Sequence, residues 1–251
     1  MSAVAAMFYR EGKIRVTNLT FIFWDLFYPL GYLLVFGVMM SRMIGPEFPI
    51  GGLDYNAFFL AGVLGMAGFG ISSNTAWSFF MDRDNGIFYE MLTYPMSRAQ
   101  YLGAKVLFNV FVAVVQALIT VVLAAMLLGV RIRFDLLPLL IVGVIGGTVG
   151  WFYFYSIFAL TIRRNDIFNT VTSIFYFVFL FASSMFYPLE PLPAVFRWVA
   201  LANPITWQVD VLRYATIGVG SPGRIALEAA AFTVFTIASF AVAVRCLERQ
   251  E

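Results

Sequence analysis

The sequence predicts an all-α membrane protein with six transmembrane helices, an N-terminal interfacial helix, a short cytoplasmic helix and a re-entrant helical hairpin before the last span. The 251 residues are 61% hydrophobic and only 12% charged, whereas soluble domains carry about 25% charged residues. Long uncharged runs match the roughly 20 apolar residues that a helix needs to cross a bilayer, and they lack the alternation of a β-barrel. We expect residues 1–251 to form a single transmembrane domain.

The N-terminal residues 1–18 are expected to form a helix that lies in the inner membrane interface. Met7, Phe8 and Tyr9 stand close to Arg10 and Lys13, and this mixture of apolar and basic side chains suits the headgroup region. A frayed terminus is the alternative interpretation.

Six segments are long and apolar enough to cross the membrane, at about residues 19–42, 56–80, 104–129, 137–162, 167–187 and 225–246. Between Arg15 and Arg42 the only charge is Asp25. A charge at membrane depth is costly unless it faces protein or water. A structural role for Asp25, in which it pairs with a basic residue, and a role in a transport pathway are both open on the sequence alone.

The distribution of basic residues predicts the orientation, because Lys and Arg collect on the cytoplasmic side of membrane spans. With both termini inside, ten of the 16 basic residues lie on the cytoplasmic side and six lie outside. We therefore expect a multi-pass protein of the cell inner (plasma) membrane with cytoplasmic N and C termini.

A polar segment, residues 82–96, separates the second and third spans on the predicted cytoplasmic side. Its sequence DRDNGIFYEMLTYPM combines cap-forming residues and a glycine with a short amphipathic stretch, and Pro95 ends that stretch. Ser97 is then placed to cap the third span. A solvated loop would explain the charges but not the Phe, Tyr and Met side chains. A docking surface for a cytoplasmic partner explains both.

Residues 188–216 are too polar to cross the membrane and too apolar for an ordinary loop. Prolines divide this region into two short helical stretches, and its irregular backbone must be covered by protein or face water. Asp210 and Arg213 are spaced to pair on one helix face. The residues that define these outer re-entrant helices are Pro193, Trp198, Asn203, Pro204, Asp210 and Arg213.

Two patterns within the spans indicate packing faces. The fourth span contains GVIGGTVG, whose small residues let helix backbones approach closely. In the fifth span one helix face carries Phe168, Phe175, Phe179 and Phe186, spaced i, i+7, i+11 and i+18. This stripe and Asp25 are candidates to line a pathway, with lipid-facing packing as the more common explanation for such aromatics. Phe177 and Phe181 fall on roughly the opposite face.

Composition excludes several classes of function. The chain has no histidine and one cysteine, so the usual transition-metal ligands are missing and we expect no metal site and no bound cofactor. A net charge of +2 without a basic stripe gives no indication of nucleic acid binding. A membrane-embedded enzyme is disfavoured because the spans lack clustered carboxylates.

Two motifs, in order and between six spans, resemble the membrane (permease) subunits of ABC transporters of the ABC-2 exporter type. The first comprises Asp82-Arg83-Asp84, Gly86, Glu90, Pro95 and Arg98. The second comprises Pro188, Leu192-Pro193, Trp198, Asn203-Pro204 and Asp210-x-x-Arg213. The resemblance covers essentially the whole chain. Ile87 departs from it, because a threonine commonly follows the glycine.

The resemblance implies that residues 82–96 hold a coupling helix seated on a separate cytoplasmic ABC ATPase subunit, present in two copies, which binds the ATP and Mg. The implied contact residues are Asp82, Arg83, Asp84, Asn85, Gly86, Ile87, Phe88, Glu90 and Met91. It also implies a second copy of this chain, surrounding membrane lipid, and export of a hydrophobic or amphiphilic substrate such as a drug, lipid or glycolipid. The chain itself has no phosphate loop, so it is expected not to be an enzyme. An ATP-independent scramblase or channel is the alternative.

Overall fold

The computed structural model describes residues 3–44 and 54–249. Residues 1 and 2 of the expected interfacial helix, residues 45–53, and residues 250 and 251 of the expected domain lie outside the described residues. All regular elements in the described part are helical. They are α1 (Ala3–Thr17), α2 (Leu19–Ile22), η1 (Phe23–Phe27), α3 (Tyr28–Gly31), η2 (Tyr32–Gly37), α4 (Val38–Ile44), α5 (Tyr55–Asp84), α6 (Ile87–Met91), α7 (Arg98–Leu128), η3 (Phe134–Leu136), α8 (Leu137–Thr161), α9 (Asn165–Phe181), α10 (Ala194–Leu201), α11 (Pro204–Ile217) and α12 (Pro222–Glu248).

The predicted all-α membrane class is confirmed. Within the described residues, five helical runs are long and apolar enough to cross a membrane: Leu19–Met43, Tyr55–Asp84, Arg98–Leu128, Phe134–Thr161 and Pro222–Glu248. The first of them joins α2 to α4 through two π-helical stretches.

The fifth predicted span, residues 167–187, is shorter than expected. Helix α9 has 17 residues and ends at Phe181, which corresponds to a rise of about 25 Å against a hydrocarbon core of about 30 Å. The side-chain amide of Asn203 donates hydrogen bonds to the carbonyls of Phe179 and Ala182, at 2.8 and 2.6 Å. These bonds satisfy carbonyls at the end of α9. The uncharged run of the sequence continues past the residue at which the helix stops.

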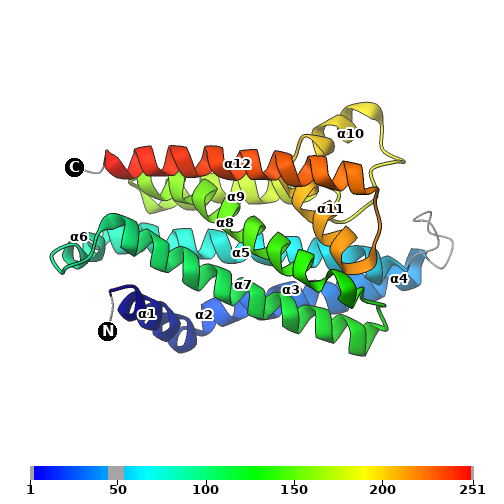
Figure 1. The fold of residues 1–251 in the computed structure, drawn as a ribbon, viewed down its shortest axis with the longest axis horizontal. Helices are drawn as coiled ribbons and strands as arrows, with labels where there is room; N and C mark the ends of the chain where they lie inside the picture. Colours follow the sequence, from blue (N-terminus) through cyan, green and yellow to red (C-terminus); the bar gives the residue numbers. More distant parts are fainter. Residues whose placement is uncertain (1–2, 45–53, 250–251) are drawn as a thin grey trace.

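Figure 1 shows an elongated bundle with α5 running along its centre. Both marked termini and α6 lie at one end, and α4, α10 and α11 lie at the other. This placement agrees with the prediction that the polar segment after the second span and the two termini share one side. The element α10–α11 is the predicted pair of short helices before the last span.

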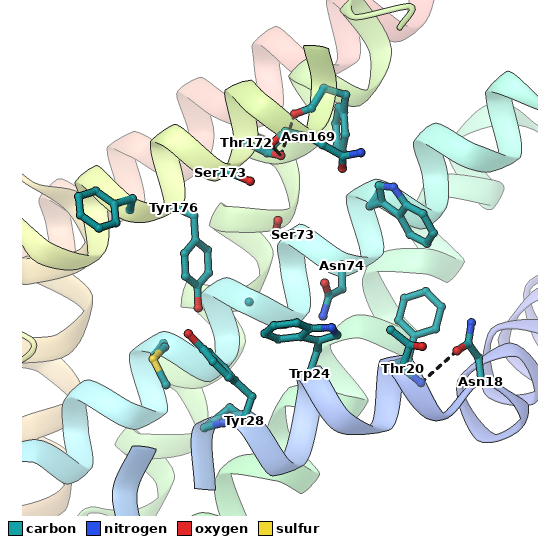
Figure 2. Close-up of a pocket in the computed structure, with 17 residues that line it drawn as sticks. Asn18, Thr20, Trp24, Tyr28, Ser73, Asn74, Asn169, Thr172, Ser173 and Tyr176 are labelled. Atoms are coloured by element: carbon teal, nitrogen blue, oxygen red, sulfur yellow. Dashed lines mark hydrogen bonds between the residues drawn. The ribbon is translucent and has the colours of Figure 1, made fainter. Parts of the chain in front are cut away.

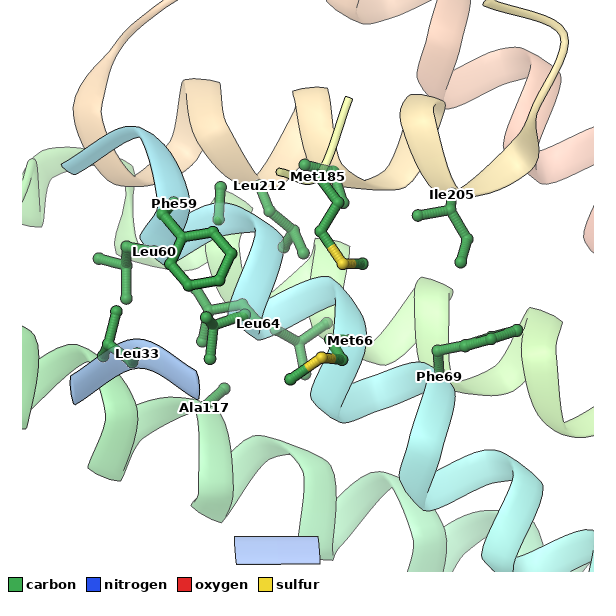
Figure 3. Packing of buried hydrophobic residues seen from close by; sticks show 14 of the residues in the cluster. Leu33, Phe59, Leu60, Leu64, Met66, Phe69, Ala117, Met185, Ile205 and Leu212 are labelled. Atoms are coloured by element: carbon green, nitrogen blue, oxygen red, sulfur yellow. The ribbon is translucent and has the colours of Figure 1, made fainter. Parts of the chain in front are cut away.

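The main core surrounds α5, which is buried along most of its length. Figure 3 shows Phe59 and Leu64 of α5 among side chains from the first span, α7 and α11, including Leu33 and Leu212. Farther along α5, Phe69 packs against rings of α8 and α9. A second apolar cluster lies toward the α6 end of the bundle. Helix α5 therefore packs against neighbours on all sides.

The small face predicted in α8 makes a close contact with α11. A Cβ added at Gly147 would lie 2.0 Å from Gln208 Nε2, and Gln208 is held in place because its Oε1 accepts a 2.6 Å hydrogen bond from Trp151 Nε1. We expect Gly147→Ala to lower the free energy of unfolding by about 1–3 kcal/mol, because the buried side chain must move.

Gly146 provides the matched control for this prediction. A Cβ at Gly146 meets nothing within 4 Å, so Gly146→Ala should be neutral or stabilising by up to about 1 kcal/mol. Thermal unfolding of both variants in detergent measures the difference, and equal stability of the two would contradict the contact.

Candidate functional site

The connection between α5 and α7 presents the surface predicted to meet a partner. Gly86 has φ +77°, a left-handed conformation that favours glycine, and α6 begins directly after it. Pro95 follows the end of α6 by four residues. The predicted cap at Ser97 is confirmed, because Ser97 and Gln100 form a capping box at the start of α7.

Only part of the predicted contact set is accessible on this surface. Asp84, Asn85 and Glu90 are exposed, and Ile87 and Met91 are half-buried. Asp82, Arg83 and Phe88 lie inside the protein instead. The Phe88 ring packs against the rings of Phe79 and Tyr101, and Arg83 donates a hydrogen bond to the carbonyl of Ile162. These three residues hold the connection in place and are not available at its surface.

A cluster of four charges, of which three are buried and one is half-buried, lies beneath α6. Lys105 of α7 is fully buried, with its Nζ 2.8 Å from Glu11 of α1 and 3.0 Å from Asp82 of α5. Arg10 contacts Asp82 at 2.6 Å, and the Tyr101 hydroxyl donates to the same carboxylate. Two positive and two negative groups thus balance, and they join α1, α5 and α7. No sequence pattern predicted this cluster, although Lys105 at the edge of an apolar run is a signal for a buried charge.

A second buried pair lies deeper in the bundle. Arg15, near the end of α1, pairs with Asp25 of the first span and donates to Thr75 Oγ1 at 2.6 Å. Asn74 Nδ2 donates to the other Asp25 oxygen at 2.9 Å. Burial lowers the pKa of the Arg15 guanidinium to about 10, partly opposed by the carboxylate of Glu11, so it stays charged at neutral pH. Asp25 therefore has the basic partner that the structural interpretation of this residue requires.

A groove of about 660 Å³ opens between the first span, α5 and α9. Figure 2 shows its labelled side chains, with Trp24 and Tyr28 on the first span facing Ser73 and Asn74 of α5 and Tyr176 of α9. The lining residues are Asn18, Thr20, Phe21, Trp24, Tyr28, Pro29, Met66, Gly70, Ser73, Asn74, Trp77, Phe168, Asn169, Thr172, Ser173, Tyr176 and Phe177. The groove thus combines aromatic rings with hydroxyl and amide groups.

The predicted phenylalanine stripe does not line this groove as a unit. Phe168 lines it, but Phe175 and Phe179 pack against the ring of Phe154 on α8. Phe186 follows the end of α9 and packs against Phe59, so the expectation of one continuous stripe along a single helix is wrong. The groove instead receives Phe177, from the face opposite the stripe. Aromatic residues occupy both faces of α9, so the spacing could not identify the face turned toward the groove.

The outer re-entrant helices surround a second charged cluster. Asp210 pairs with Arg213, as the spacing predicted, and also with Arg224 of α12 at 3.0 Å. Arg213 is buried, donates to the carbonyl of Ser184 at 2.7 Å, and stacks on Phe58 with Cζ 4.0 Å from the ring centroid. Burial lowers the pKa of Arg213 from its ordinary value, while the carboxylate of Asp210 opposes that shift.

The remaining predicted residues of the outer region have distinct positions. Pro193 precedes α10, on which Trp198 is 71% exposed. Asn203 caps α11, because its Oδ1 accepts from the amide of Ile205 at 2.9 Å, and Pro204 is the first residue of that helix. This region also borders a cavity of about 250 Å³ that includes Glu190, Asp210 and Arg213 among its lining residues.

Comparison with known proteins identifies the family. Two relatives bear the name "Putative transport permease ycf38", one from Cyanophora paradoxa, 25% identical over 197 residues, and one from Porphyra purpurea, 24% identical over 194 residues. Each alignment covers 74% of this chain, and the chain spans 64% of the length of each relative. The family model described as ABC-2 type transporter matches residues 2–217. The chain therefore belongs to the ABC-2 type transporter family.

Proposed function

We propose that this chain is the membrane subunit of an ATP-driven exporter, in which two copies work with two cytoplasmic ATPase subunits. The complex moves a hydrophobic or amphiphilic molecule out of the cytoplasm across the cell inner membrane. The observation that carries the proposal is the attachment of α6 to the bundle. Its exposed groups can meet a partner. The turn that bears it is anchored to three helices through the buried charges of Glu11, Asp82 and Lys105, together with the half-buried Arg10.

This attachment supports transmission of force from a cytoplasmic partner. Helices α5 and α7 continue directly from the two ends of the α6 connection, and α1 is tied to both by the same charges. A partner that pulls on Glu90 or Asp84 would move these helices together as a rigid unit. The side groove shares α5 as one wall, so such a movement would change its width.

The side groove is the proposed path of the cargo. Trp24 and Phe177 line it and are 46% and 63% exposed, so its rim is accessible from the side of the bundle. A second copy of the chain packed on this face would close the groove into a chamber, with ATP-driven movement opening it outward.

One observation favours an ATP-independent scramblase as the alternative. The groove is open along the side of the bundle and carries polar groups into an apolar surrounding, a feature that also lets a lipid headgroup cross. Vesicles that contain the chain alone, and vesicles that contain the chain with its ATPase subunit and ATP, separate the two functions. Movement of cargo without ATP at the full rate supports the scramblase.

Substitution of Glu90 tests the docking surface. We expect Glu90→Gln to leave the melting temperature unchanged, since the side chain is exposed, and to lower cargo-stimulated ATPase activity of the complex by about tenfold, because a contact to the partner's charged groups is lost. Glu248→Gln, an exposed carboxylate at the end of α12, is the control and should keep full activity. Normal transport by the Glu90 variant would rule out this docking assignment.

A further inference from the structure

Among the residues that the structure describes, those that line the side groove include no charged side chain, although the chain has 16 basic and 14 acidic residues. The ion pair of Asp25 with Arg15, which Asn74 of the groove contacts, is buried and is neutral as a pair. A charged group that enters the groove would lose its water without gaining an opposite charge, and such desolvation is expensive. The groove therefore disfavours both cations and anions.

The polar atoms of the groove have defined donor and acceptor roles. Because a carboxylate only accepts, Asn74 must turn its Nδ2 toward Asp25, which leaves Asn74 Oδ1 as an acceptor. Asn169 donates through Nδ2 to Asn165 Oδ1 at 3.0 Å, so its own Oδ1 is also an acceptor. Thr172 donates its proton to the carbonyl of Phe168 at 2.8 Å, and its oxygen lone pairs accept.

The groove also offers donors, one of them at the start of the first span. Asn18 Oδ1 accepts from the amide of Thr20 at 3.1 Å, which leaves the Asn18 Nδ2 hydrogens for another partner. The Ser173 hydroxyl, at the exposed rim of the groove, can donate or accept. A ligand that matches this mixture needs groups that both donate and accept, and a hydroxyl group does both.

The opposite wall is aromatic. Trp24 and Tyr28 of the first span face Ser73 and Asn74 across the groove in Figure 2, and Trp77 of α5 and Phe177 of α9 add aromatic surface beside the polar groups. Rigid rings offer large contact area to an apolar chain or ring. Binding pockets of this size place a few oriented polar groups among mainly apolar walls.

We infer that the groove binds an uncharged amphiphile that carries several hydroxyl groups, such as an alkyl glycoside, and rejects cationic or anionic amphiphiles of the same chain length. The hydroxyls exchange bonds to water for bonds to Asn74, Asn169 and Thr172, which costs little. As a statement about the exported cargo, this inference rests on the proposed function. As a statement about what the groove binds, it is tested on the chain by itself.

The test uses the full-length chain in lipid nanodiscs and three probes that share a decyl chain: decyl maltoside, decyltrimethylammonium and decyl sulfate. Each is added below its micelle-forming concentration. The change in tryptophan fluorescence that is absent from a Trp24→Phe variant reports on the groove. We expect decyl maltoside to bind at least about tenfold more tightly than either charged probe. A charged probe that binds as tightly, or no Trp24-dependent signal from any probe, overturns the inference.

A charge placed on the groove wall tests the cause of the selectivity. Ser173→Asp should strengthen binding of decyltrimethylammonium by about tenfold, because the cation then gains an opposite charge. Thr161→Asp adds the same charge at the exposed end of α8, outside the groove-lining residues, and should leave binding unchanged. An equal gain in both variants would show that general surface charge, and not the groove, governs binding.

Failure of the proposed function gives a different result. In the complex with the ATPase subunit, saturating decyl maltoside should compete with export of a labelled alkyl glycoside. If the probe occupies the groove in nanodiscs and export continues unchanged, the transport path is wrong while the binding preference stands. If decyltrimethylammonium blocks export through the groove and decyl maltoside does not, the path stands and the preference is overturned.

Discussion

Replacement of Lys105 by methionine is expected to lower the free energy of unfolding by about 3–5 kcal/mol, because removing one member of a buried ionic cluster leaves an uncompensated charge. Lys105 is fully buried between the carboxylates of Glu11 and Asp82, 2.8 and 3.0 Å away. Arg10 alone would then face both carboxylates. Chemical unfolding in detergent, followed by circular dichroism, measures the loss.

Two further variants show whether charge balance is the cause. Lys13→Met removes an exposed lysine of α1 and should change stability by less than about 0.5 kcal/mol. The double variant Lys105→Met with Glu11→Gln restores one positive and one negative group, Arg10 and Asp82, and should regain part of the loss, so the two substitutions are not additive. Additive effects in this cycle would contradict a coupled cluster.

Substitution of Arg213 by methionine is expected to lower the free energy of unfolding by a similar amount, about 3–5 kcal/mol, for a different reason. The buried guanidinium joins three elements, since it pairs with Asp210, donates to the carbonyl of Ser184 and stacks on Phe58 of α5. Its loss leaves the Ser184 carbonyl without this donor and removes the tie between α11 and the bend after α9. Thermal unfolding measured by tryptophan fluorescence reports the change.

Lysine at this position separates charge from geometry. Arg213→Lys keeps the positive charge but cannot reproduce the planar fork, so we expect a loss of about 1.5–3 kcal/mol, the cost of a hydrogen bond to a charged group. Arg197→Lys, on the exposed side of α10, is the control and should leave the free energy of unfolding unchanged. Full stability of Arg213→Lys would mean that charge alone is required there.

Much of the fold could be predicted from the sequence because hydrocarbon length and cap chemistry are local. The uncharged runs predicted the long helices, and Ser97 predicted the start of α7. The end of α9 could not be predicted in this way. Its last carbonyls bond to Asn203, which is 21 residues away from Ala182 in the sequence, whereas the sequence stays uncharged to Phe186.

The site was predictable in part. The i,i+3 spacing of Asp210 and Arg213 predicted their pairing because both lie on one helix. The partners of Asp25 and Lys105 come from other helices, α1 and α5 among them, so their identities depend on packing that no local pattern encodes. The aromatic faces of α9 failed as a prediction for the same reason, since Phe175 and Phe177 are equally apolar and only the neighbouring helices determine which one meets the groove.

The two roles of Asn203 link α9 to α11. Its Oδ1 caps the start of α11, and its Nδ2 donates hydrogen bonds to carbonyls at the end of α9. The α9 side chains Tyr176 and Phe177 line the groove. Because Asn203 is bonded to both helices, a tilt of α11 would also move the C-terminal end of α9. Under the proposed function, release of cargo at α11 and a change in the α9 wall of the groove would then be one coupled movement. No separate contact would be needed to keep the exit closed while cargo is bound in the groove.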